Sequence, residues 1–183
     1  PDYILTNTGL EEINFSLAAG YERKKYGIQA YYSNFTTDLG ILRSAHIGNL
    51  TDLRSAIGSE RPSVVEPFSY AINNPRQEVG HSLFKLSTSR YFDDKGKISL
   101  QYAKQLNRRS EYDIRRGGRS ETPSLDLKLE THSVDLVWES SPRRGWSSSY
   151  GITGQLQENI NVPGTGIRPL VPNYRSTSGG AFV

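Results

Sequence analysis

The sequence lacks cysteine, and it lacks any apolar run approaching the roughly 20 residues of a membrane helix. Without cysteine the chain can form neither a disulfide framework nor a zinc site with thiolate ligands. The 22 Lys and Arg residues outnumber the 19 Asp and Glu residues only slightly, and a net charge of +3 does not by itself imply nucleic acid. There is no secretion signal, and because the chain opens at Pro1 rather than Met we expect a processed or excised piece.

Composition favours β-structure. The 11 tyrosines and 17 glycines are typical of strands joined by many turns, and 183 residues are enough for one domain. One short helix is predicted at residues 49–58 (NLTDLRSAIG), where Asn49 can cap the first turn and Gly58 can follow the last one. Its apolar residues would share one face: Leu50, Leu53 and Ile57.

The stretch INFSLAAGYERKKYGIQAYYSN predicts a hairpin over about residues 12–35. With Arg23 and Lys24 in the turn, Tyr21 is predicted to lie opposite Tyr26. Alternation then places on one apolar face Phe15, Leu17, Ala19, Tyr21, Tyr26, Ile28, Ala30 and Tyr32. The opposite face is small and polar, with Asn14, Ser16, Ala18, Gly20, Gly27, Gln29, Tyr31 and Ser33. A soluble sandwich would turn the apolar face inward, whereas a membrane barrel would turn it outward toward lipid.

A second hairpin is predicted at about residues 79–107, with its turn at DDKG and Phe92 opposite Ile98. Its apolar face would hold Phe84, Leu86, Leu100, Tyr102 and Leu106. Arg90 and Lys104 fall on that same face, so they lie near its margins, snorkel, or indicate an error in the predicted register.

A third hairpin is predicted at about residues 124–159, with its turn at SSPRRG. Its apolar face would hold Val134, Leu136, Trp138, Trp146, Tyr150, Ile152 and Leu156. Leucines 125, 127 and 129 alternate out of phase with Val134 and Leu136. Two explanations are open: a bulge near Thr131, or a strand that continues past the layer that needs an apolar face.

The connections differ systematically in length. The turns inside the hairpins are tight, whereas the links at about residues 36–78, 112–123 and 160–178 are long against a usual median of about 4–6 residues. In an up-and-down meander all tight turns then lie at one end and all long loops at the other. Aromatic pairs accompany the tight turns: Tyr21 and Tyr26, Tyr91 and Phe92, Trp138 and Trp146. This combination is typical of an outer-membrane barrel.

The predicted fold is therefore all-β: an antiparallel up-and-down meander of about six strands, with one short helix in a long loop, belonging to a larger transmembrane β-barrel. Three hairpins are too few to close such a barrel, because the smallest have about eight strands. The final residues, GGAFV, look like the start of another strand. Residues 1–183 are accordingly interpreted as a partial β-barrel segment.

Four stretches resemble the barrel portion of TonB-dependent outer-membrane receptors, especially those of Bacteroidetes-type bacteria. They are NTGLEEINFSLAAGYE (7–22), AHIGNLTDL (45–53), LDLKLETHSVDLVWE (125–139) and GIRPLVPNYRS (166–176). The resemblance implies a barrel of about 22 strands with a plugged lumen, in the outer membrane of a Gram-negative bacterium. It implies uptake of a scarce extracellular ligand (a siderophore, another metal chelate or a glycan), driven by an inner-membrane energy-transducing complex through a plug domain. No plug is visible in this sequence, so the segment alone is not expected to transport anything. Outer-membrane lipid is the other expected partner.

Ligand contacts are expected in the long connections, because loops on a rigid scaffold carry recognition. The candidates supply cationic and aromatic groups: Arg43, His46, Arg115, Arg116, Arg168 and Tyr174. The stretch RRSEYDIRRGGR (108–119) could attract an anion, or it could be a solvated loop that neighbouring carboxylates partly neutralise. A single Arg-Gly-Gly without repeated aromatics does not indicate RNA, and no nucleic-acid partner is expected.

No catalytic residues are predicted, because no GxSxG elbow or comparable arrangement occurs. His46, His81 and His132 lack the short spacings of zinc sites, so neither a metal site nor a cofactor is expected. The alternative from another class of protein is a soluble, surface-exposed β-sandwich for adhesion or carbohydrate binding, whose apolar faces pack together. Such a module would stay monodisperse in plain buffer, whereas a barrel segment would need detergent or lipid.

Overall fold

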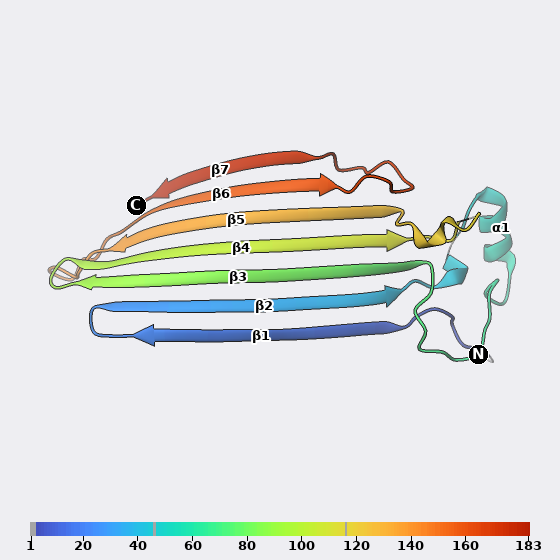
Figure 1. Ribbon diagram of the computed structural model, residues 1–183, viewed down its shortest axis with the longest axis horizontal. Helices are drawn as coiled ribbons and strands as arrows, with labels where there is room; N and C mark the ends of the chain where they lie inside the picture. The colour runs from blue at the N-terminus through green and yellow to red at the C-terminus, as the bar shows by residue number, and fades with distance from the viewer. Residues whose placement is uncertain (1–2, 46, 116) are drawn as a thin grey trace.

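The computed structural model describes residues 3–45, 47–115 and 117–183. Within these residues seven strands form one antiparallel sheet in chain order (Figure 1). They are β1 (Leu10–Glu22), β2 (Tyr26–Gly40), β3 (Arg76–Phe92), β4 (Gly96–Tyr112), β5 (Leu125–Glu139), β6 (Ser149–Asn161) and β7 (Tyr174–Phe182). The predicted up-and-down meander is confirmed, with seven strands rather than about six. The additional strand is β7, which includes most of GGAFV.

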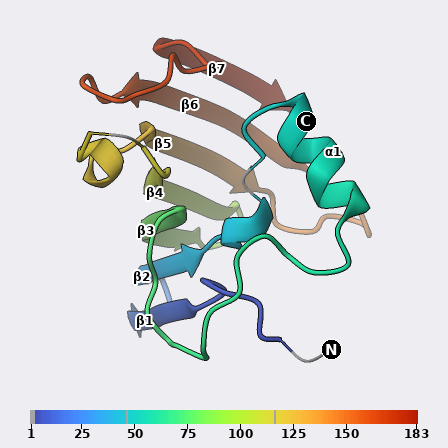
Figure 2. The same ribbon diagram turned by 90° about the vertical axis from the view of Figure 1, so that its right-hand side faces the viewer.

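The sheet is a single layer. Figure 2 shows its strands following an arc from β1 to β7. Ala103 is the one apolar residue among the described positions that is classed as buried, and many large apolar side chains are exposed, Leu17 at 68 % and Ile13 at 60 % among them. Most strands are 13 to 17 residues long, well above the usual five or six. The described fold therefore has no hydrophobic core between two layers.

The predicted helix is present as α1 (Leu50–Gly58), in the connection between β2 and β3. The side chain of Asn49 caps it by accepting a hydrogen bond from the backbone N–H of Asp52 at 2.9 Å. Gly58 is the last helical residue and Ser59 follows as the C-cap, so the predicted end was early by one position. None of the described helices is long and apolar enough to cross a bilayer.

The faces of the first two hairpins are as predicted, but both registers were wrong by two residues. Tyr21 pairs with Ile28 rather than with Tyr26, and Ile98 pairs with Arg90 rather than with Phe92. Period-two alternation determines which face a residue occupies, and a shift of two positions leaves that face unchanged. The turn geometry decides the register: Gly96 has a φ of 114°, and a Cβ there would lie 2.0 Å from the carbonyl oxygen of Glu139. The second turn thus uses only residues 93–95, and β4 begins at a glycine that nothing larger could replace. The first turn uses residues 23–26, two more than predicted.

In the third hairpin, β5 runs without a bulge, and its pairing with β4 keeps one register from Leu125 to Glu139. The second of the two explanations is therefore correct: the strand continues past the apolar layer. Trp146 does not lie on β6 as predicted. It lies in the connection 140–148, where it forms an isolated bridge with Arg143 around a tip with positive φ at Arg144 (51°) and Gly145 (82°).

The strands also extend further toward the long connections than predicted. The connections span residues 41–75, 113–124 and 162–173 instead of about 36–78, 112–123 and 160–178. The sequence at these strand ends alternates little in hydropathy, because both faces there carry polar residues. Pattern reading therefore assigned several strand residues to loops.

Candidate functional site

The three long connections lie together at one end of the molecule, and the tight turns lie at the other end (Figure 1). α1 stands beyond the strand ends on the long-loop side (Figure 1). The predicted segregation of loops by length is therefore present in the structure, and the long-loop end is the natural place to look for a binding surface.

Asn7 ties the N-terminal segment to both ends of connection 41–75. Its side-chain N–H groups donate to the carbonyls of Ile41 at 2.7 Å and Pro75 at 2.8 Å. Its side-chain oxygen accepts from the backbone N–H of Asn73 at 2.7 Å. Asn7 has a φ of 56°, a left-handed conformation that asparagine tolerates better than most residues. One side chain thus closes the base of the longest loop.

Arg76 connects this base to the second long connection. Its guanidinium donates to the side chain of Asn74 at 2.7 Å, pairs with Glu78 at 3.0 Å and Glu121 at 3.4 Å, and lies 3.9 Å above the ring of Tyr112. Desolvation lowers the pKa of Arg76, but the hydrogen bonds and charges of Glu78 and Glu121 outweigh it and raise the pKa above its usual value. Sequence reasoning missed Arg76 because it directly follows Pro75 in a stretch that was read as loop.

The second and third long connections also contact each other. The backbone N–H groups of Gly166 and Ile167 donate to the carbonyls of Pro123 at 3.1 Å and Ser124 at 3.0 Å. The guanidinium of Arg115 lies directly over Gly166, where a Cβ would fall 1.6 Å from an arginine nitrogen. The loop end is consequently one connected surface and not a set of separate loops.

The predicted ligand residues lie at this end but do not converge on one pocket. Arg43 lies in a 3₁₀ turn (Arg43–Ala45) and pairs with Glu66 at 2.9 Å. Arg115 covers Gly166, and Arg168 is exposed. The hydroxyl of Tyr174, the first residue of β7, donates to the side chain of Gln157 at 2.9 Å. His46 and Arg116 lie outside the described residues.

A small hollow of about 230 Å³ lies between the loops. It is lined by Ile41, Ala45, Pro75, Glu111, Tyr112, Asp113, Ser124 and Ile167. None of the predicted ligand residues lines it. Among the described residues, no group of three or more His, Cys, Asp or Glu side chains is arranged to hold a metal ion.

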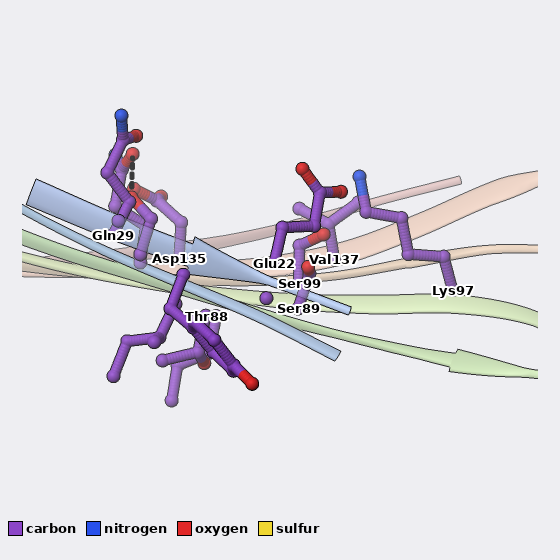
Figure 3. Close-up of a pocket in the computed structure, with 15 residues that line it drawn as sticks. Glu22, Gln29, Thr88, Ser89, Lys97, Ser99, Asp135 and Val137 are labelled. Carbon is purple, nitrogen blue, oxygen red and sulfur yellow. Dashed lines mark hydrogen bonds between the residues drawn. The ribbon is translucent and has the colours of Figure 1, made fainter. Parts of the chain in front are cut away.

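The face that was predicted to be small and polar, here called the inner face, carries a larger hollow of about 650 Å³ near the tight turns. Figure 3 shows Gln29, Asp135, Glu22 and Lys97 on one side of the strands and Thr88 on the other. Ser87 donates to Gln101 there at 3.3 Å. Its inner-face lining is mostly polar, with Ser87, Ser89, Ser99 and Gln101 among its members, and Val137 is an apolar exception.

The opposite, outer face carries what we call the apolar band. Its members are Ile13, Phe15, Leu17, Ala19, Tyr21, Tyr26, Ile28, Ala30, Tyr32, Phe84, Leu86, Ile98, Leu100, Tyr102, Val134, Leu136, Trp138, Tyr150, Ile152 and Leu156. Aromatic rings are in contact within it, with centroids 5.9 Å apart for Phe15 and Tyr32 and for Trp138 and Tyr150. Apolar side chains thus line most of the outer face over the half of the sheet nearest the tight turns. Thr88 and Arg90 on β3 interrupt the band, and the Arg90 guanidinium lies 5.2 Å from the ring centre of Phe92.

Toward the long loops, the outer face of β4 and β5 becomes charged, and we call this area the charged patch: Lys104, Arg108, Asp126, Lys128, Glu130 and His132. Lys104 pairs with Glu130 at 2.8 Å and Arg108 with Asp126 at 2.8 Å. Hydrogen bonds from Lys104 and then from His132 lower the pKa of Glu130 from 4.5 to about 2. Lys104 therefore lies at the margin of the apolar face, as one of the predicted explanations required.

No protein-family model, curated protein or solved structure matches this chain.

Proposed function

We propose that this chain forms part of the wall of a TonB-dependent outer-membrane receptor, whose long loops meet a scarce ligand outside the cell. The observation that supports the membrane placement best is the shape of the apolar band. Its border toward the long loops does not follow the rows of laterally paired residues. Instead it crosses them at an angle.

The residues along one row show this inclination. Ile13 is the last apolar outer residue of β1. The row of lateral pairing partners that starts at Ile13 runs through Thr36, Gly80 and Arg108 to Lys128 on β5. On β3 the last apolar residue is Phe84, four residues (80 to 84) nearer the tight turn. On β5 it is Val134, six residues (128 to 134) nearer the tight turn. Between β1 and β5 the border thus moves by six residues over four strand-to-strand steps. The trend is not uniform: Leu106 on β4 lies beyond Lys104 on the outer face, and on β6 the border returns by two residues to Leu156, which pairs with His132.

A membrane predicts this displacement. Strands lie roughly 4.8 Å apart with a rise of about 3.4 Å per residue, and barrel strands tilt by about 45°. A line of constant depth therefore shifts by about 1.4 residues per strand, or about six residues over four strands. The sheets of a soluble sandwich cross at only about 30°, so the border of a covered apolar face would shift less, by about 0.8 residues per strand.

The tight turns are displaced in the same direction. The first hairpin ends at the hydrogen bond from Arg23 to Tyr26. Tyr26 pairs laterally with Arg90, and the same row continues through Ile98 to Trp138. The second hairpin continues two residues (90 to 92) beyond this row, and the third continues five residues (138 to 143) to the bridge at Arg143. Between β1 and β5 the ends of the tight turns are therefore displaced in the same direction as the apolar border.

The receptor function rests on the resemblance and on the connected loop surface. The ligand would be a siderophore, another metal chelate or a glycan, and uptake would require the energy-transducing complex of the inner membrane. Seven strands are fewer than the smallest closed barrels have, so the wall would be completed by further strands. Arg43, Arg115 and Arg168 would supply cationic contacts to the arriving ligand.

Uptake by cells that express the full-length protein tests this proposal, with a ferric siderophore and an oligosaccharide as probes. We expect accumulation of one probe, lost when the energy-transducing complex is deleted. Because a hydrogen bond to a charged group contributes about 1.5–3 kcal/mol, Arg43→Ala, Arg115→Ala and Arg168→Ala together should weaken binding by about ten-fold or more. The matched control is Lys24→Ala, Arg143→Ala and Arg144→Ala in the tight turns. Accumulation that persists without the complex would contradict the proposal.

A further inference from the structure

The charged patch has a defined position relative to the apolar band. The continuous apolar run ends at Tyr102 on β4 and at Val134 on β5, and Lys104 and His132 follow directly on the same outer face. Leu106 is the one apolar residue within the patch, between Lys104 and Arg108. If the band lies in hydrocarbon, as proposed above, the patch lies at the depth of the lipid headgroups. It faces away from the loops and away from the inner face.

The cations of the patch are more exposed than its carboxylates. The side chains of Arg108, Lys104 and Lys128 are 63 %, 44 % and 43 % exposed, whereas those of Glu130 and Asp126 are 28 % and 5 % exposed. The carboxylates therefore lie beneath and hold the cationic groups at the surface. A molecule that approaches over β4 and β5 therefore meets positive charge first, whereas the exposed Glu158 lies beside Glu130 on β6.

The ion pairs do not use all the donors. An ammonium has three N–H groups and a guanidinium has five. Arg108 directs Nε and Nη2 to Asp126, at 3.2 and 2.8 Å, which leaves Nη1. Arg108 on β4 and Lys128 on β5 are direct lateral neighbours. Side chains of direct lateral neighbours are roughly 5 Å apart, a spacing over which one phosphate can contact both. Lys104 lies on the same face of β4, four residues from Arg108, but its Nζ and that of Lys128 meet at Glu130, 2.8 and 3.6 Å from the two carboxylate oxygens.

From these observations we infer that the charged patch binds the phosphate of an anionic lipid, whose acyl chains lie on the apolar band beside it. The inference rests on the proposed membrane placement. Cationic side chains at a membrane surface attract anionic lipids, and phosphate accepts charge-assisted hydrogen bonds from lysine and arginine. The occupant is thus a lipid, and free phosphate, which lacks the chains, gains nothing from the band.

Native mass spectrometry of the full-length protein in detergent tests this inference, with phosphatidic acid and phosphatidylcholine of the same acyl chains as probes and inorganic phosphate as a third. The test variant is Lys104→Gln with Lys128→Gln, which keeps Arg108 and so keeps Asp126 paired. The matched control is Arg54→Gln with Arg61→Gln, which removes the same charge from the longest loop.

We expect the native protein to retain phosphatidic acid in preference to phosphatidylcholine. The test variant should bind phosphatidic acid at least about five-fold more weakly, because each basic residue near a membrane surface contributes about 1 kcal/mol. The control should bind like the native protein. Equal retention of both lipids, no effect of the test variant, or equal binding of inorganic phosphate would overturn the inference. Failure of the protein to insert into lipid bilayers at all would instead overturn the proposed function, which separates the two.

Discussion

Individual residues explain why the outer face changes character along β5. His132 bridges the two regions: its ring contacts the hydroxyl of Tyr102 at 2.8 Å on the apolar side and Glu130 at 3.1 Å on the charged side. Glu130 also pairs with Lys104 and with Lys128 at 3.6 Å. One carboxylate thereby organises three cationic or polar partners on two neighbouring strands.

This arrangement gives a pH dependence with a definite sign. In the folded protein the pKa of Glu130 is lowered from 4.5 to about 2. Ionised Glu130 therefore stabilises the fold fully above about pH 4.5, and this contribution is lost as the pH falls toward about 2. The unfolding midpoint in detergent should therefore fall across this window in the native protein and fall less in Glu130→Gln. Glu158→Gln, on the same outer face, controls for the loss of one carboxylate. A Glu130→Gln profile that matches the native profile would disprove the assignment.

At the scale of elements, the faces of the strands could be predicted from the sequence, but their registers and ends could not. Alternation assigns Leu17 and Ser16 to opposite faces whatever the turn is, whereas the pairing of Tyr21 depends on how many residues the turn uses. Strand ends were missed where polar residues occupy both faces, as at Asp38 and Glu78. α1 was predictable because a local signal, the Asn49 cap, determines its start.

The candidate site was less predictable than the fold. Arg43 and Arg115 could be assigned to the loop end from the lengths of the connections alone. Their contacts with Glu66 and Gly166 could not, because those contacts join residues far apart in the sequence. The loop network around Asn7 and Arg76 depends on the same long-range meeting of segments.

The orientation of the elements can be tested by proteolysis of intact cells. Connection 41–75 is predicted to be extracellular and the turn at residues 23–25 periplasmic, because long loops and short turns are separated in this way in outer-membrane barrels. A protease of broad specificity should cut within residues 59–70 and spare residues 23–25. Permeabilising the outer membrane, the control, should expose the turn. Cleavage of the long connection only after permeabilisation would reverse the orientation.

The whole molecule is a one-layer sheet with two different faces and two different ends. Apolar residues cover most of the outer face near the tight turns, the inner face is more polar there, and the long loops are joined into one surface. These features need a partner for the apolar face, and the displacement of the apolar border between β1 and β5 is what the proposed planar partner predicts. The central claim is therefore that lipid covers the outer face to a constant depth.

Depth-dependent fluorescence quenching tests this claim most directly. Because the chain has no cysteine, single cysteines at positions 13, 14, 128 and 134 can each carry one fluorophore. In vesicles whose acyl chains carry spin labels, we predict strong quenching at Ile13→Cys and Val134→Cys, which the inclined border places at the same depth. We predict little quenching at Asn14→Cys on the inner face and at Lys128→Cys, although residue 128 belongs to the same lateral row as residue 13. Equal quenching at positions 13 and 14, or at positions 13 and 128, would contradict the account.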